Sequence, residues 1–118
     1  MANQSDEVLA LAKEALDDLK AVDMQVLDVR SLTDVTDYMV IATGNSSRQV
    51  KALANSVIMA AKEAGMPALG VEGEQDADWI LIDLADVVVH VMQTEMREFY
   101  QLEKLWTAHA GGAATANP

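Results

Sequence analysis

The most constraining feature of this chain is an almost unbroken apolar block at residues 79–92, whose main break lies at Ala85 and Asp86. We predict that the chain reverses at this break and forms a β-hairpin, because aliphatic residues recur at every second position on both sides of it. On one side of the hairpin every cross-strand pair is then aliphatic: Leu84 with Val87, Ile82 with Val89, and Ile80 with Val91. That side is expected to face the hydrophobic core.

The other side of the predicted hairpin has a mixed composition. Its side chains are those of Trp79, Leu81, Asp83, Val88, His90 and Met92. Such a face is too apolar to meet only water and too polar to be sealed inside a core. We therefore predict that it contacts a partner.

The hairpin belongs to a longer succession of helical and strand patterns. The expected elements are a helix at 6–19, strands at 24–29 and 38–43, a helix after the caps at 44–47, a strand at 68–71, the hairpin, and a helix from Thr94. The strand at 38–43 has no polar alternation, which is typical of a central strand covered by helices on both faces. The order is αββαβββα, and the fold class is α/β.

The length of 118 residues suits a single domain with one core. We place this domain at residues 1–106 and expect 107–118, which are small and unpatterned, to be a disordered tail.

The charge of the chain is strongly negative. With 19 acidic and 8 basic side chains the net charge is −11, so a nucleic-acid backbone would be repelled, and any contact with RNA should be secondary. The acids concentrate at residues 67–92, which contain neither Lys nor Arg: Glu72, Glu74, Asp76, Asp78, Asp83 and Asp86. This region should attract a basic partner.

Cysteine is absent, so disulfides, thiolate zinc sites and cysteine nucleophiles are excluded. The N-terminal residues lack the pattern of a signal or transit peptide. The longest apolar runs have five residues, whereas a bilayer span needs about 20. We expect a cytoplasmic protein without a membrane association.

A first candidate site is the turn from Gly44 to Arg48, which could hold a phosphate on the amide groups of a helix N-terminus. The same residues also serve as helix caps, which is the interpretation that we favour. The turn lacks a phosphate-binding loop motif, and the following strand, 68–71, lacks the acid pair that a nucleotidyltransferase would use to hold magnesium.

The polar side chains of the mixed hairpin face give a second candidate site. His90 and Asp83 could form a metal site or an acid–base pair, although one histidine and one carboxylate are a poor ligand set. A histidine hydrogen-bonded within the sheet surface or lying in a contact patch is the favoured alternative. We expect no metal, no cofactor and no catalytic residue, and the serine hydrolase motif GxSxG is absent.

Two aromatic residues are candidates for an interface. Trp79 could plug the end of the core or anchor a contact. Tyr100 lies outside the apolar stripe of the last helix, beside Arg97 and other charged residues, so we expect its ring to face solvent or a partner.

Three stretches of the sequence together resemble one known family. DYMVIATGNSSRQVKALA, LGVEGEQDADWILIDLADVVVHVM and REFYQLEKLW are similar to the ribosomal silencing factors, RsfS, also called Iojap or YbeB-like proteins. The resemblance covers about residues 5–106. It implies a mixed five-stranded sheet in a nucleotidyltransferase-like fold without catalytic residues. It also implies a translational repressor that binds the fourteenth protein of the large ribosomal subunit and blocks subunit joining during starvation.

The resemblance also implies which residues make that contact. Carried over by position they are Trp79, Leu84, Asp86, His90, Met92 and Tyr100. Hairpin geometry agrees for Trp79, His90 and Met92 but assigns Leu84 to the core face. Two residues depart from the family pattern: Ala85 replaces a frequent Gly, which favours a wider turn, and Gln49 replaces a frequent His.

We therefore hypothesise a non-catalytic regulator that docks an acidic, aromatic surface on a ribosomal protein. A nucleotide-binding or nucleotidyltransferase-like enzyme that uses the Gly44–Arg48 turn is the alternative. A homodimer through the same hairpin face is compatible with the first hypothesis.

Overall fold

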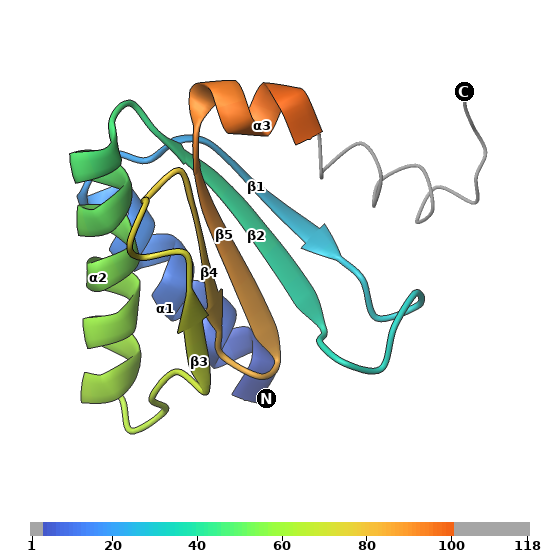
Figure 1. Ribbon diagram of the computed structural model, residues 1–118. Coiled ribbons are helices and arrows are strands. Elements are labelled where there is room, and N and C mark those ends of the chain that lie inside the picture. Colours follow the sequence, from blue (N-terminus) through green and yellow to red (C-terminus); the bar gives the residue numbers. More distant parts are fainter. Residues whose placement is uncertain (1–3, 101–118) are drawn as a thin grey trace.

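The computed structural model describes residues 4–100, and the predicted order αββαβββα is confirmed (Figure 1). The elements are α1 (Gln4–Asp18), β1 (Val22–Asp28), β2 (Tyr38–Gly44), α2 (Ser47–Glu63), β3 (Gly70–Glu72), β4 (Trp79–Asp83), β5 (Val87–Gln93) and α3 (Thr94–Tyr100). The predicted domain boundary at 106 and the tail at 107–118 lie outside the described residues. Within these residues, no helix combines the length and apolar character that a bilayer span requires.

The strands form one mixed five-stranded sheet in the order β1-β2-β5-β4-β3. Only β2 and β5 pair in parallel, with Tyr38 opposite Val87 and Ile41 opposite His90, and the other neighbours are antiparallel. Strand β2 lies inside the sheet, and six of its seven residues are buried, which confirms the expected central strand. The strand predicted at 68–71 begins later, at Gly70, because pairing with β4 starts at Gly70 opposite Asp83.

Helices α1 and α2 pack together against one face of the sheet (Figure 1). Their apolar stripes are buried at the positions that helical spacing indicates, and they meet the aliphatic side of the β4–β5 hairpin. The fully buried contacts include Leu16 of α1, Leu53 and Val57 of α2, and Ile82 and Val89 of the hairpin. This layer is the main hydrophobic core.

In the described part of the chain, the second face of the sheet lacks the full helical layer that the sequence predicts. A smaller cluster buries Val29, Met39, Ile41 and Met92, and Leu32 and Met96 pack against it. The cover therefore consists of the β1–β2 connection and the short helix α3 instead of a full helical layer. This arrangement leaves part of β4 accessible on that face, where Leu81 is half-buried.

The hairpin has the predicted pairing, with Ile80 opposite Val91 and Ile82 opposite Val89. Its turn is tight, because Leu84 N donates to Val87 O at 2.9 Å and Asp86 N donates to Leu84 O at 3.0 Å. Ala85 adopts a positive φ of 71°, and Asp83 Oδ1 accepts a hydrogen bond from Ala85 N at 2.8 Å. The wider turn expected from alanine is thus wrong: the Asp83 carboxylate and the flanking ladder hold alanine in a conformation that favours glycine.

Candidate docking surface

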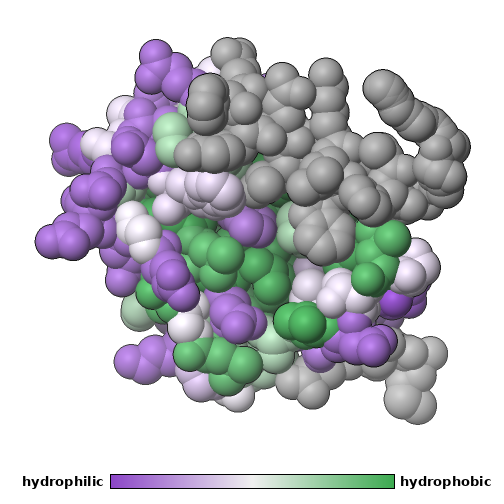
Figure 2. All heavy atoms as spheres, turned by 45° about the vertical axis from the view of Figure 1, so that its right-hand side comes forward, coloured by the Kyte–Doolittle hydropathy of each residue, from purple (hydrophilic) through white to green (hydrophobic). Residues whose placement is uncertain are grey.

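The mixed side of the hairpin lies on the sheet face opposite α1 and α2. Figure 2 turns the molecule toward this side and shows apolar residues in the middle of the view, with hydrophilic residues to their left and below them. Trp79, Leu81, Asp83 and Val88 are half-buried here, whereas His90 is 6% exposed and Met92 is fully buried. The face therefore has a sealed centre and an accessible edge along β4.

Trp79 and His90 form a hydrogen-bonded pair across the hairpin. The indole Nε1–H donates to His90 Nδ1 at 2.9 Å, and the two ring centroids lie 5.8 Å apart. An indole N–H can only donate, so Nδ1 must carry a lone pair, and the imidazole proton is on Nε2. Burial lowers the pKa of His90 from 6.5 to about 4, which keeps the ring neutral at pH 7. This is the hydrogen-bonded histidine that we favoured over an acid–base pair.

The predicted contact residues do not all lie at the surface. Leu84 is 6% exposed and belongs to the main core, as the alternation of side chains along the hairpin predicts and contrary to the contact implied by the family resemblance. Met92 pairs with Trp79 on the mixed face but is fully buried in the smaller cluster. Asp86 is half-buried at the turn, where its carbonyl accepts hydrogen bonds from the amides of Asp37 and Tyr38. The side chain of Tyr100 lies outside the described part of the structure.

A small pocket of about 260 Å³ opens beside Trp79 and is lined by Glu72, Gly73, Trp79 and Leu81. Gly73 has a φ of +89°, and a Cβ atom at this residue would lie 2.1 Å from Trp79 O. Only glycine therefore allows the acidic loop to pass so close to the start of β4. Sequence reasoning missed Gly73, although a glycine between acids in a loop is a signal for a turn.

The acidic loop before β4 is fastened to the end of β5. Gln93 Nε2 donates to Asp78 Oδ1 at 3.0 Å and to Ala77 O at 3.2 Å. Ala77 is itself fully buried and its amide donates to Gly73 O at 3.0 Å. Of the exposed acids in this loop, Glu72 lines the pocket beside Trp79 and Asp78 is held by Gln93, whereas Glu74 and Asp76 lie between them in the sequence.

Arg97 is a second residue whose role sequence reasoning missed. It was expected on a charged surface beside Tyr100, but it is only 7% exposed. Its Nη1 donates to Thr43 Oγ1 at 2.7 Å and also to Asp23 O. These bonds fasten α3 to the ends of β1 and β2, and an isolated arginine gives no sequence signal that its guanidinium is buried.

The Gly44–Arg48 turn has the geometry of a helix cap. Ser46 Oγ accepts a hydrogen bond from Gln49 N at 3.1 Å, and Gln49 Oε1 accepts one from Asn45 N at 2.6 Å. Gln49, which stands where the family often has His, thus completes a reciprocal cap. Among the described residues no group of three or more His, Cys, Asp or Glu is placed to hold a metal. These contacts favour capping over phosphate binding.

Comparison with known proteins assigns the family. The model of the family "ribosomal silencing factor during starvation" matches residues 2–117. The chain belongs to the ribosomal silencing factor family. The ribosomal silencing factor of Chromobacterium violaceum is 50% identical over 100 residues, 85% of this chain and 82% of that protein. The factor of Haemophilus influenzae is 52% identical over 93 residues, 79% of this chain and 91% of that protein.

A solved structure gives the same result for the fold. The crystal structure of a Chromobacterium violaceum protein matches with a TM-score of 0.86 at 44% identity, covering 98% of this chain and 92% of that one. The single mixed α/β domain of this ribosomal silencing factor is thereby confirmed. The nucleotidyltransferase-like name for the fold stays a prediction.

Proposed function

We propose that this chain represses translation by binding the large ribosomal subunit through its fourteenth protein and sterically blocking the joining of the small subunit. Family membership supports this proposal. The repression would act in the cytoplasm during starvation or stationary phase, without catalysis and without a cofactor. The surface that would make the contact is the accessible edge of the mixed hairpin face, which we call the docking surface: Glu72, Trp79, Leu81 and Asp86.

The observation that carries the proposal is the fixed position of Trp79. Its indole is anchored by His90 at 2.9 Å, and its backbone is packed against Gly73. A large aromatic ring held in one orientation loses little conformational entropy when it meets a partner, which is typical of interface anchors. His90, Met92 and Leu84 would act from beneath by supporting this ring and its hairpin. Tyr100 stays a predicted contact at the end of α3.

The charge of the docking surface indicates a basic partner. Exposed carboxylates recur from Glu72 to Asp78, and Ala77, the one buried residue of this stretch, carries no charge. A basic protein such as one that binds ribosomal RNA would be steered to this edge, whereas RNA itself would be repelled. RNA contacts are therefore secondary in this proposal.

Co-sedimentation with isolated large subunits in a low-salt sucrose gradient tests the proposal. We expect the wild-type chain to migrate with the large subunit and to reduce light scattering from subunit joining when small subunits are added. Trp79→Ala and Asp86→Lys should weaken both effects. The matched control is Asp17→Lys, which makes the same charge change at an exposed residue of α1 on the opposite side of the sheet. Absence of co-migration would refute the proposal.

A homodimer through the same docking surface would compete with the ribosome. Light scattering against concentration detects such a dimer. If Trp79→Ala shifts the dimer to monomer and also lowers ribosome binding, the two contacts share this surface.

A further inference from the structure

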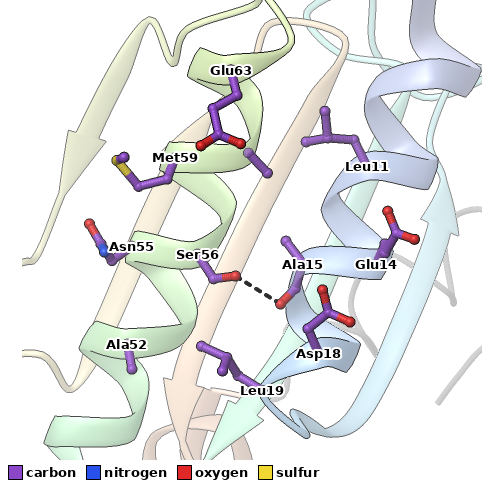
Figure 3. A pocket seen from close by; sticks show the side chains of 11 residues that line it. Leu11, Glu14, Ala15, Asp18, Leu19, Ala52, Asn55, Ser56, Met59 and Glu63 are labelled. Carbon is purple, nitrogen blue, oxygen red and sulfur yellow. Dashed lines mark hydrogen bonds between the residues drawn. The ribbon is translucent and has the colours of Figure 1, made fainter.

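A groove on the helical side of the molecule is not used by the proposed docking surface. It runs between α1 and α2, has a volume of about 460 Å³, and is built from residues of both helices and Leu19 (Figure 3). The residues that line it differ from the fully buried ones, such as Leu16 and Leu53, that face the sheet. The groove therefore opens away from the sheet.

The groove is lined by apolar and polar side chains in nearly equal measure, and some of its large apolar side chains are accessible. Leu19 is 41% exposed and Met59 is 45% exposed, and Leu11 lies on the same wall as Leu19. One polar side chain that lines it already has a partner, because Ser56 Oγ donates to Ala15 O at 3.0 Å (Figure 3). This leaves accessible apolar surface that the fold itself does not bury.

Each end of the groove carries a carboxylate at the C-terminus of a helix. The two helices run in opposite directions, so the end of α1 at Asp18 and the end of α2 at Glu63 lie at opposite ends of the groove (Figure 3). The negative pole of each helix dipole adds to these charges. Glu14 adds a third carboxylate between them.

These three acids are not explained by the stability of the fold. In residues 4–100 the structure has one salt bridge, between Asp28 and Arg30, so none of the three is paired. A carboxylate at a helix C-terminus is electrostatically unfavourable, and α1 has no base in its last turn. Among the described residues no Lys or Arg lines the groove, and Lys62 in the last turn of α2 lies outside it.

We propose that this groove binds a basic amphipathic helix of a second protein partner. This partner differs from the one that binds the docking surface. The apolar face of that helix would cover Leu19 and Met59, and its Lys or Arg residues would reach Asp18 and Glu63. From Ala52 to Glu63 the groove follows α2 for about 16 Å at the helical rise per residue. The partner should therefore carry two basic residues about ten positions apart on one side of its apolar stripe.

Charge argues against a second copy of this chain as the occupant. The net charge is −11, and pairing two such grooves would bring the carboxylates of both copies together. Because the groove and the docking surface lie on opposite sides of the sheet, one molecule could hold both partners at once.

Fluorescence anisotropy with a labelled synthetic peptide tests this proposal. The probe is an amphipathic helix of about four turns with Leu along one face and Lys at both ends, and the same peptide with Glu in place of Lys is the negative probe. Asp18→Lys should weaken binding of the Lys peptide about fivefold, and Met59→Glu should weaken it further. The matched control Asp17→Lys makes the same charge change one residue outside the groove and should have a much smaller effect.

Four outcomes would overturn the proposal. The first is no binding of the Lys peptide, and the second is equal weakening by Asp17→Lys and Asp18→Lys, which would indicate only diffuse attraction. The third is amide chemical-shift changes at Trp79 instead of along α1 and α2. The fourth is dissociation of a dimer by Met59→Glu, which would show that the occupant is a second copy of the chain. Ribosome binding by Met59→Glu should stay at the wild-type level, which separates this test from that of the proposed function.

Discussion

Acidification should destabilise this protein through a single buried side chain, His90. In the folded state burial lowers the pKa of His90 from its ordinary value of 6.5 to about 4. Protonation would also place a positive charge on the nitrogen that accepts the indole hydrogen of Trp79, so both groups would become donors and the 2.9 Å bond would be lost. The unfolded chain therefore takes up the proton at a higher pH than the folded chain.

The sign and size of the effect follow from this difference. The stability contributed by neutral His90 is complete above pH 6.5 and decreases as the pH falls from 6.5 toward 4. The separation of the two pKa values corresponds to a total loss of about 3 kcal/mol, of which about 2 kcal/mol is lost by pH 5. Because His90 is only 6% exposed, solvent screening removes little of this. Against a typical stability of about 5–15 kcal/mol the loss is large.

Urea unfolding followed by circular dichroism at several pH values from 7 to 4 measures this loss. The control is His90→Asn, because the amide oxygen can accept the Trp79 hydrogen bond but the side chain does not titrate in this range. The other ionisable groups are common to both proteins, so the difference between their free energies of unfolding isolates His90. We expect the wild-type advantage to shrink by about 3 kcal/mol between pH 7 and pH 4. A difference that stays constant with pH would refute the reasoning.

Three further predictions concern the backbone and the helix that support the docking surface. Ala85→Gly should raise the free energy of unfolding by about 0.5–1 kcal/mol, measured by urea unfolding, because it relieves the positive φ of 71° at the hairpin turn. Gly73→Ala should lower it by about 2 kcal/mol or more and weaken ribosome binding, because its Cβ would meet Trp79 O, whereas Gly70→Ala, with nothing within 4 Å, should leave both unchanged. Arg97→Lys should cost about 2 kcal/mol and increase amide hydrogen exchange in α3, because lysine cannot reproduce the guanidinium bonds to the ends of β1 and β2. Unchanged exchange in α3 would show that this helix is held by its apolar contacts alone.

The local order of the fold was predictable from the sequence because each element has a regular period. The alternation around Ala85 predicted every pair of the hairpin, including the inward position of Leu84. The helix predicted after the caps at 44–47 is likewise present as α2, which begins at Ser47 after the N-cap Ser46. These features depend on near neighbours in sequence, where side-chain direction is fixed by backbone geometry.

The burial of the mixed face could not be predicted in the same way. The alternation of side chains along the hairpin assigns Met92 to that face, but it does not indicate what covers the face. The cover comes from α3 and from Val29 in the β1–β2 connection, which is more than 50 positions earlier in the chain, while the parallel pairing of β2 with β5 places Ile41 beside Met92 in the same cluster. Buried Arg97 and the close approach of Gly73 depend on the same long-range contacts, for which one sequence carries no periodic signal.

The covering of Met92 changes how the docking surface would work. A contact residue that is fully buried cannot contribute area to an interface unless the sheet surface opens, which would expose the smaller cluster to water. Trp79 needs no such opening, because its ring is already at the edge and is held in place by His90. The interior residues then affect binding indirectly, by fixing the orientation of one ring. On this argument Met92→Leu, which keeps the volume, should leave ribosome binding nearly intact, whereas Trp79→Ala should weaken it strongly.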